Sequence, residues 1–74
     1  MRALGKVLNL TPRGQVLVRS TGEPRMGADV TDRRGTKVGR VADLIGPVRS
    51  PYVVVHPHPR ADPRRLLGQE LFVR

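Results

Sequence analysis

The side chains of this sequence that could act as acids, bases or metal ligands are few and scattered. Six carboxylates and two histidines are spread over 74 residues, and there is no cysteine. Asp29 and Asp32 are near each other in sequence, but aspartate in such a segment is typical of turns, where its side chain bonds the backbone ahead. No serine or threonine stands in a pattern with a base and an orienting group. We therefore predict that the protein is not an enzyme.

Asp43 differs from the other carboxylates because its sequence neighbours are mostly apolar. A carboxylate in such a strand is expected to be tied to backbone N–H groups or to an arginine, because a buried unpaired charge is costly. His56 and His58 lie two residues apart across a proline, and a zinc site there would need further ligands from elsewhere, since such sites use three or four protein ligands. We predict solvated histidines, no metal and no cofactor.

The basic residues indicate the class of partner. The formal net charge is +8, and Lys6 and Lys37 are the only lysines, so arginine supplies almost all of the positive charge. Arginine binds phosphate in a planar, bidentate way, which favours nucleic acid or a complex that contains it. Tyr52 and Phe72 are the only aromatic residues, too few to stack several bases of a single strand. We expect weak phosphate contacts, or a charge that complements RNA held by another protein.

The length of the chain bounds its architecture and surroundings. A single domain at 1–74 buries only about 60% of the surface that its unfolded form exposes. No apolar run resembles a signal peptide or is long enough to cross a bilayer. The basic residues form neither a polybasic cluster nor an amphipathic helix, which disfavours a membrane surface. Together with the absence of cysteine, these features predict a cytoplasmic protein that is monomeric on its own.

Short apolar runs separated by turn residues predict an all-β fold. The expected strands are 4–10, 15–19, 28–31, 36–45, 52–56 and 70–73. Segments 11–14 and 32–35 have the residues of tight turns, and 62–68 has an N-cap, a proline and a closing glycine around one helical turn. With this many short strands, a small closed six-stranded barrel removes the edges that an open sheet would expose.

Two glycines mark expected bends of these strands. Gly5 lies inside the first strand, whose alternation is imperfect. In the fourth strand, Val38 and Val41 are three residues apart and cannot share one face of a regular strand. A bulge or sharp coil at Gly39 would bring both valines into the core, and such bends help a small sheet to close.

The segment 35–57 organises the rest of the chain as strand, corner and strand. Gly46-Pro47 and Ser50-Pro51 make the corner rigid, because a residue before proline is pushed out of the helical region. The run Tyr52–Val55 is apolar at successive positions, so one face is left over in a domain too small for two cores. We predict that this face binds a partner. The alternative is a strand curled so tightly that loops partly cover both faces.

The central segment resembles a known family. Residues 38–48, VGRVADLIGPV, followed after two residues by PYVVV at 51–55, are similar to the signature of the Gar-one subunit of box H/ACA ribonucleoproteins in its short archaeal form. A V-G-x-V-x-D strand, a G-P-V corner and a P-Y strand occur in the same order and spacing. The resemblance is close over the central third and extends elsewhere only as a pattern of strands and turns.

The resemblance implies a barrel of the translation-factor and reductase type in the guide-RNA complex that converts uridine to pseudouridine in ribosomal RNA. The isomerase of that complex is a separate dyskerin-like pseudouridine synthase, on which the Gar-one subunit docks without supplying chemistry. The family often has phenylalanine at the position of Ile45 and lysine at that of His56. The implied partner-binding residues are Ile45, Gly46, Pro47, Val48, Pro51, Tyr52 and Val54.

Two other classes of function stay open at this point. Barrels that act in ribosome maturation also carry a V-G-x-V-x-D strand, so a free-standing ribosome-associated protein is one alternative. A small enzyme is the other, and it would need a convergent pair of titratable residues in a pocket. The G-P-V and P-Y elements favour the H/ACA subunit over the ribosome-associated barrel, and the sequence shows no pair of titratable residues that would favour the enzyme.

Overall fold

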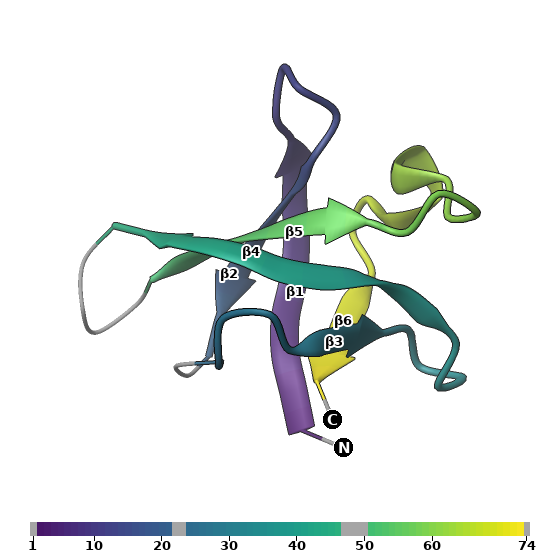
Figure 1. Cartoon of the computed structure of the whole chain (residues 1–74), viewed down its shortest axis with the longest axis horizontal. Helices are drawn as coiled ribbons and strands as arrows, with labels where there is room; N and C mark the ends of the chain where they lie inside the picture. The colour runs from purple at the N-terminus through teal and green to yellow at the C-terminus, as the bar shows by residue number, and fades with distance from the viewer. Residues whose placement is uncertain (1, 22–23, 47–50, 74) are drawn as a thin grey trace.

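The computed structural model describes residues 2–21, 24–46 and 51–73 and has the predicted all-β architecture. Six strands and one short 3-10 turn follow each other along the chain (Figure 1). They are β1 (Arg2–Leu10), β2 (Val16–Ser20), β3 (Asp29–Thr31), β4 (Lys37–Ile45), β5 (Tyr52–Pro57), the 3-10 turn η1 (Pro63–Leu66) and β6 (Glu70–Val73).

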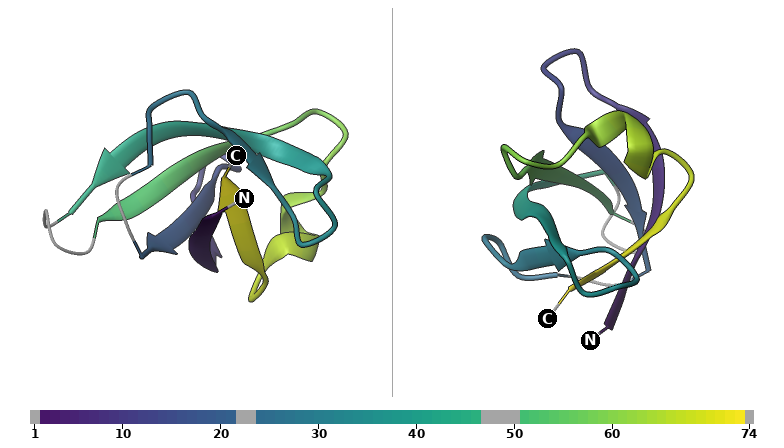
Figure 2. Two further views of the ribbon diagram at one scale, coloured as in Figure 1. Left: turned by 90° about the horizontal axis from the view of Figure 1, so that it is seen from below. Right: turned by 90° about the vertical axis from the view of Figure 1, so that its right-hand side faces the viewer.

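The strands close into a single antiparallel barrel in the order β1-β2-β5-β4-β3-β6, as the sequence predicts. Figures 1 and 2 show the long ribbon of β4 and β5 crossing β1 steeply, with the two ends of the chain side by side. The pairing of Arg2 with Val73 joins those ends. Closure leaves the strands without an unpaired edge of the kind that promotes aggregation.

The core is made mostly of valine, whose branched side chain suits a tightly curved sheet. On β5, Val53 and Val55 are fully buried while Tyr52 and Val54 are half-buried, which is the alternation of a strand with one inner face. η1 contributes Leu66 to the same core. The buried apolar residues are Leu4, Val7, Val16, Val18, Val30, Val38, Val41, Val53, Val55, Leu66 and Leu71.

The turns form as the sequence predicts, with one exception. Gly14 N donates to Thr11 O at 2.9 Å, which closes the turn between β1 and β2. Asp32 Oδ1 accepts from the backbone nitrogens of Arg34 and Thr36 at 2.8 and 3.0 Å. The prediction that Asp29 is also a turn former is wrong. It is the first residue of β3, and its Oδ1 is 3.2 Å from Lys37 Nζ on the neighbouring strand β4, so its carboxylate pairs with a lysine across the sheet.

The remaining local predictions concern the 3-10 turn and the bend at Gly5. Asp62 caps η1, since its Oδ1 accepts from Arg64 N at 3.0 Å. The register of β1 with β6 shifts between Ala3 and Gly5. Both predictions are confirmed.

β4 contains two irregularities. Opposite β3, the residues Val30 and Thr31 pair with Gly39 and Lys37, so Val38 is an extra residue of β4. The predicted bulge is therefore confirmed beside Gly39, and it buries both Val38 and Val41. Opposite β5, pairing is regular through Gly39, and the register shifts further along, between Val41 and Asp43. The sequence carries no signal for this second bulge, because Leu44 and Ile45 are both large and aliphatic.

No helix in the described ranges 2–21, 24–46 and 51–73 is long and apolar enough to span a membrane.

Candidate partner-binding surface at the β4–β5 corner

β4 and β5 form a long antiparallel ribbon. Its directly paired residues run from Gly39 with Pro57 at one end to Ile45 with Tyr52 at the other. The second end leads into the corner that the sequence analysis selected. The structure describes the predicted site residues Ile45, Gly46, Pro51, Tyr52 and Val54, whereas Pro47 and Val48 lie outside the described residues.

Ile45 and Tyr52 lie directly opposite each other on neighbouring strands. Ile45 is 46% exposed, and Tyr52 is half-buried. Val54, two residues after Tyr52, is also half-buried, so it shares the outer face of β5. These three side chains lie on the outer face of the barrel, with the exposed Asp43 opposite Val54, and we call the three together the corner surface.

The bulge at Ala42 is what turns Ile45 outward. In a regular strand, Asp43 and Ile45 would point to the same side as the buried Val41, because side chains alternate with a period of two. The register shift between Val41 and Asp43 makes Ala42 an extra residue and reverses that parity. Leu44 consequently packs against the core while Ile45 faces the solvent.

The same bulge decides the environment of Asp43. Its Oδ1 accepts from Leu44 N at 2.8 Å, which confirms the predicted tie to a backbone N–H. The side chain is nevertheless exposed, so its apolar sequence neighbours do not bury it. The reversed parity after Ala42 is the physical reason.

Gly46 fixes the Tyr52 ring at the corner. Its φ is +93°, a conformation that L side chains rarely adopt. A Cβ at this position would lie 3.1 Å from Tyr52 Cδ2, so the ring packs directly against the Gly46 backbone. Pro51 is buried, and its carbonyl accepts from Ser20 N at 3.2 Å. The Tyr52 ring therefore packs against the Gly46 backbone, and the hydrogen bond from Ser20 of β2 to Pro51 fixes the backbone just before Tyr52.

β2 adds neighbours that sequence reasoning missed. Leu17 pairs with Val54, and Arg19 pairs with Tyr52. Leu17 is half-buried and Arg19 is exposed, and they alternate with the fully buried Val16 and Val18. The alternation within β2 could have placed both side chains outside, but only the strand order shows that they lie next to β5.

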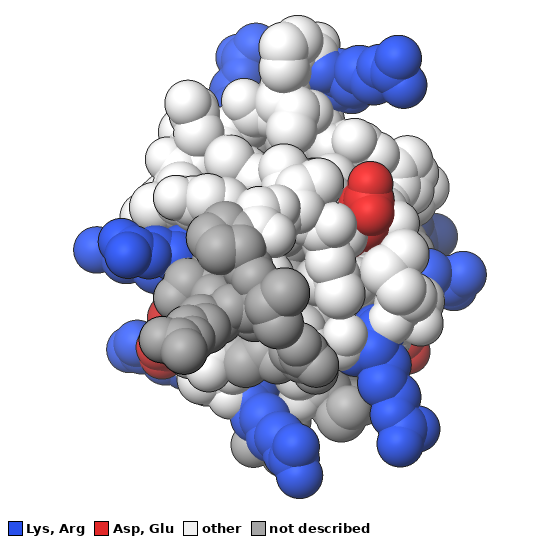
Figure 3. Space-filling model, turned by 90° about the vertical axis from the view of Figure 1, so that its left-hand side faces the viewer, with Lys and Arg blue, Asp and Glu red and all other residues white. Residues whose placement is uncertain are grey.

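The charge around this end of the barrel is distributed unevenly. Among the described residues in Figure 3, uncharged side chains cover much of that face, an acidic side chain lies within it, and lysine and arginine side chains stand mainly at the rim.

The histidines occupy different environments. His56 is exposed, as predicted, but His58 is half-buried, and its Nδ1 accepts from Arg60 N at 3.2 Å. The prediction of a simply solvated His58 is therefore incomplete, because the turn after β5 folds back onto the ring. Within residues 2–21, 24–46 and 51–73, no three His, Asp or Glu side chains gather into a group that could hold a metal ion.

Comparison with known proteins places the chain among archaeal relatives. No family model matches it. An uncharacterized protein of Methanothermobacter thermautotrophicus is 32% identical to it, in an alignment that covers 99% of this chain and 83% of that protein. An uncharacterized protein of Methanocaldococcus jannaschii is 35% identical over 52 residues, which are 70% of this chain and 63% of that protein. This chain belongs to the same family as the Methanothermobacter protein.

Proposed function

We propose that this protein is a non-catalytic subunit of a box H/ACA guide-RNA pseudouridylation complex and that it docks on the dyskerin-like pseudouridine synthase. The corner surface of Ile45, Tyr52 and Val54 makes the contact together with the neighbouring Gly46, and the buried Pro51 holds the start of β5 through its carbonyl. The guide RNA is reached mostly through the synthase. The protein acts as a monomer in the cytoplasm, in ribosomal RNA modification and ribosome biogenesis.

The outward position of Ile45 is the observation that carries this proposal. A bulge disrupts the strand ladder locally, and bulges are typical of places where a side chain must be re-aimed. Here the bulge at Ala42 turns the Ile45 side chain from the core to the outer face of the barrel. It is 46% exposed there, opposite Tyr52. An isolated exposed apolar residue needs no explanation, but Ile45 is paired with an aromatic residue in a cross-strand row.

The properties of Tyr52 suit the centre of such a contact. Tyrosine offers a large rigid apolar ring with a polar tip, and it is enriched among residues that dominate binding energy. Because Gly46 supports one part of the ring, the side chain loses less conformational freedom when a partner covers it. The resemblance of residues 38–55 to the Gar-one signature supports the synthase as that partner.

A docked subunit without its own chemistry can still raise the rate of the complex. Lid opening or product release often limits steady-state turnover. A subunit that binds one conformation of a mobile element more tightly shifts the population toward it. We assign this role to the docked barrel, acting on the loop of the synthase that grips substrate RNA.

Titration calorimetry with the purified dyskerin-like synthase tests the docking. Tyr52→Ala should weaken binding roughly thirtyfold, because truncation of a central interface residue commonly costs about 2 kcal/mol. Tyr52→Phe, which keeps the ring, should bind within about threefold of the natural protein. Circular dichroism must show that both variants keep the β-sheet spectrum.

Two outcomes would contradict the proposal. Unchanged affinity of a folded Tyr52→Ala variant would place the interface elsewhere. A wild-type protein that fails to bind the synthase but cosediments with ribosomal subunits would favour the free-standing ribosome-maturation barrel.

A further inference from the structure

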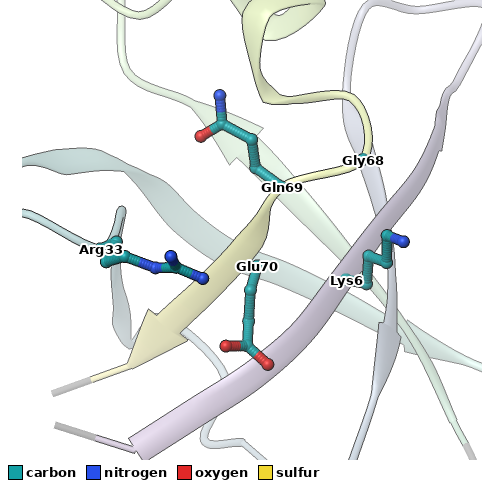
Figure 4. Close-up of a pocket in the computed structure, with 5 residues that line it drawn as sticks. All are labelled: Lys6, Arg33, Gly68, Gln69 and Glu70. Carbon is teal, nitrogen blue, oxygen red and sulfur yellow. The ribbon is translucent and has the colours of Figure 1, made fainter.

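Among the described residues, two surface hollows are lined in part by basic side chains, and their chemistry differs. The first is formed by Lys6, Arg33, Gly68, Gln69 and Glu70. Figure 4 shows the Glu70 carboxylate beside the two cationic side chains, where it would repel an anion. The second lies beside the end of the β4–β5 ribbon far from the corner, and its lining includes no carboxylate. Its residues are Lys37, Gly39, Arg40, His56, Pro57, His58 and Pro59.

We propose that the second hollow, which we call the basic hollow, binds a phosphate group of an RNA backbone. This goes beyond the docking role proposed above, because it gives the barrel its own contact with RNA. The contact uses a surface separate from Ile45 and Tyr52.

The paired strands place two cationic or donor side chains side by side. Arg40 and His56 are direct cross-strand partners, and both are exposed. At the neighbouring pair, a Cβ on Gly39 would lie 2.5 Å from His56 O and 2.8 Å from Val55 Cγ1. The absence of a side chain at Gly39 therefore lets β4 and β5 approach closely beneath Arg40 and His56.

Hydrogen bonds fix His58 at the edge of the hollow. Its backbone nitrogen donates to Val38 O at 2.8 Å, and its carbonyl accepts from Ala61 N at 2.9 Å. The ring Nδ1 accepts from Arg60 N at 3.2 Å. A neutral imidazole whose Nδ1 accepts a bond carries its proton on Nε2, which is then available as a donor. The turn thus prepares one oriented donor before any ligand arrives.

The charge balance of the basic hollow favours an anion. Lys37 Nζ is 3.2 Å from Asp29 Oδ1, so its charge is partly compensated. Asp29 of β3 is also the cross-strand partner of Arg40 on β4. Within the described part of the chain, however, Arg40 makes no ion pair. The Arg40 guanidinium is therefore the principal charge, and a guanidinium binds phosphate oxygens in a bidentate way.

The size and lining of the hollow favour a backbone phosphate over a whole nucleotide. Its volume of ≈ 160 Å³ is below the roughly 300–1,000 Å³ of typical small-molecule pockets. Its lining includes no phenylalanine, tyrosine or tryptophan, the large rings on which bases usually stack. Phosphate contacts of this kind position RNA without reading its sequence.

The location of the hollow makes both contacts compatible. Four residues along β5, roughly 13 Å, separate His56 of the hollow from Tyr52, and Val54 lies between them on the same face. A synthase centred on Ile45 and Tyr52 would leave the basic hollow open. One ribbon would then hold an RNA phosphate at a fixed distance from the protein partner.

Fluorescence anisotropy tests the inference with the full chain and a fluorescein-labelled oligouridylate of about twelve nucleotides, within the size range that small barrels bind. Arg40→Gln should weaken binding roughly fivefold and reduce the slope of log affinity against log salt by about one, as expected for a lost phosphate contact. Arg13→Gln, a matched loss of one exposed arginine in the β1–β2 turn, should weaken binding less than about twofold.

Three further measurements distinguish binding at the basic hollow from diffuse electrostatic attraction and from binding of a free nucleotide. Nuclear magnetic resonance with the same oligonucleotide should shift the amides of Gly39, His56 and His58 more than those of Lys6 and Glu70. Equal losses for Arg40→Gln and Arg13→Gln would show diffuse attraction and overturn the site. Displacement of the RNA by micromolar uridine monophosphate would overturn the RNA assignment in favour of a free nucleotide. Tyr52→Ala should leave RNA affinity unchanged, so this test can fail independently of docking on the synthase.

Discussion

The two ends of the β4–β5 ribbon are built from the same pair of strands but present different chemistry. At one end, Arg40 and His56 face outward over a close strand crossing at Gly39. At the other, Ile45 and Tyr52 face outward over the corner. The difference arises because one extra residue between them reverses which positions point out. A single bulge can therefore give one ribbon a basic end and an apolar end.

The largest expected effect concerns the two glycines of the ribbon. Gly39→Ala should destabilise the fold by about 3 kcal/mol, because the new methyl group would collide with the β5 backbone in a packed region. Gly46→Ala should cost only about 1 kcal/mol, mainly the strain of positive φ at an exposed position. For a domain of this size, 1 kcal/mol lowers the melting temperature by roughly 4–8 °C.

Thermal melts followed by circular dichroism compare the two variants under identical conditions. The ratio of the two shifts is the informative quantity, since both substitutions add the same methyl group. Equal shifts in melting temperature would mean that β4 and β5 can move apart at Gly39 without a cost in stability. The close approach of the two strands beneath Arg40 would then not be required by the fold.

The success and failure of sequence reasoning can be followed along β4. The mismatch of Val38 and Val41 was visible in the sequence, since two valines three residues apart cannot share a face, and the predicted bulge was found beside Gly39. The bulge at Ala42 left no such signal. Leu44 and Ile45 are both large and aliphatic, so the sequence fits the core with either of them inside. Strand pairing, which depends on β5, decides between them.

The candidate site was predictable in part for the same reason. The corner residues followed from a linear motif, and the structure brings Ile45 and Tyr52 together as direct partners. Leu17 and Arg19 were missed because β2 is distant in sequence and becomes a neighbour only when the barrel closes. The fixed orientation of His58 depends on a hydrogen bond from Arg60 N, which composition and spacing do not reveal.

The next prediction uses two apolar residues of equal exposure. Ile45 and Leu67 are each 46% exposed, and only Ile45 belongs to the corner surface. Ile45→Asp should weaken binding to the synthase roughly thirtyfold, about 2 kcal/mol, because a carboxylate would be desolvated in the interface. Leu67→Asp, after η1, should change the affinity less than about twofold.

Surface plasmon resonance with immobilised synthase measures both affinities. Matched thermal melts show whether the two substitutions disturb the fold equally. A comparable loss of binding for Leu67→Asp would indicate that the partner also covers the opposite side of the barrel, and the corner surface would then lose its special role.

The smallest expected effect is on turnover by the synthase complex, and it distinguishes two ways in which the corner surface could help. If docking eases release of substrate RNA, addition of this protein should raise multiple-turnover pseudouridine formation about threefold and change the single-turnover rate much less. Ile45→Asp should remove the gain in proportion to lost binding, while Leu67→Asp should retain it. The comparison needs two time courses, with enzyme in excess and with substrate in excess. Equal stimulation in both would mean that the docked barrel assembles the active site of its partner, because product release does not enter a single turnover.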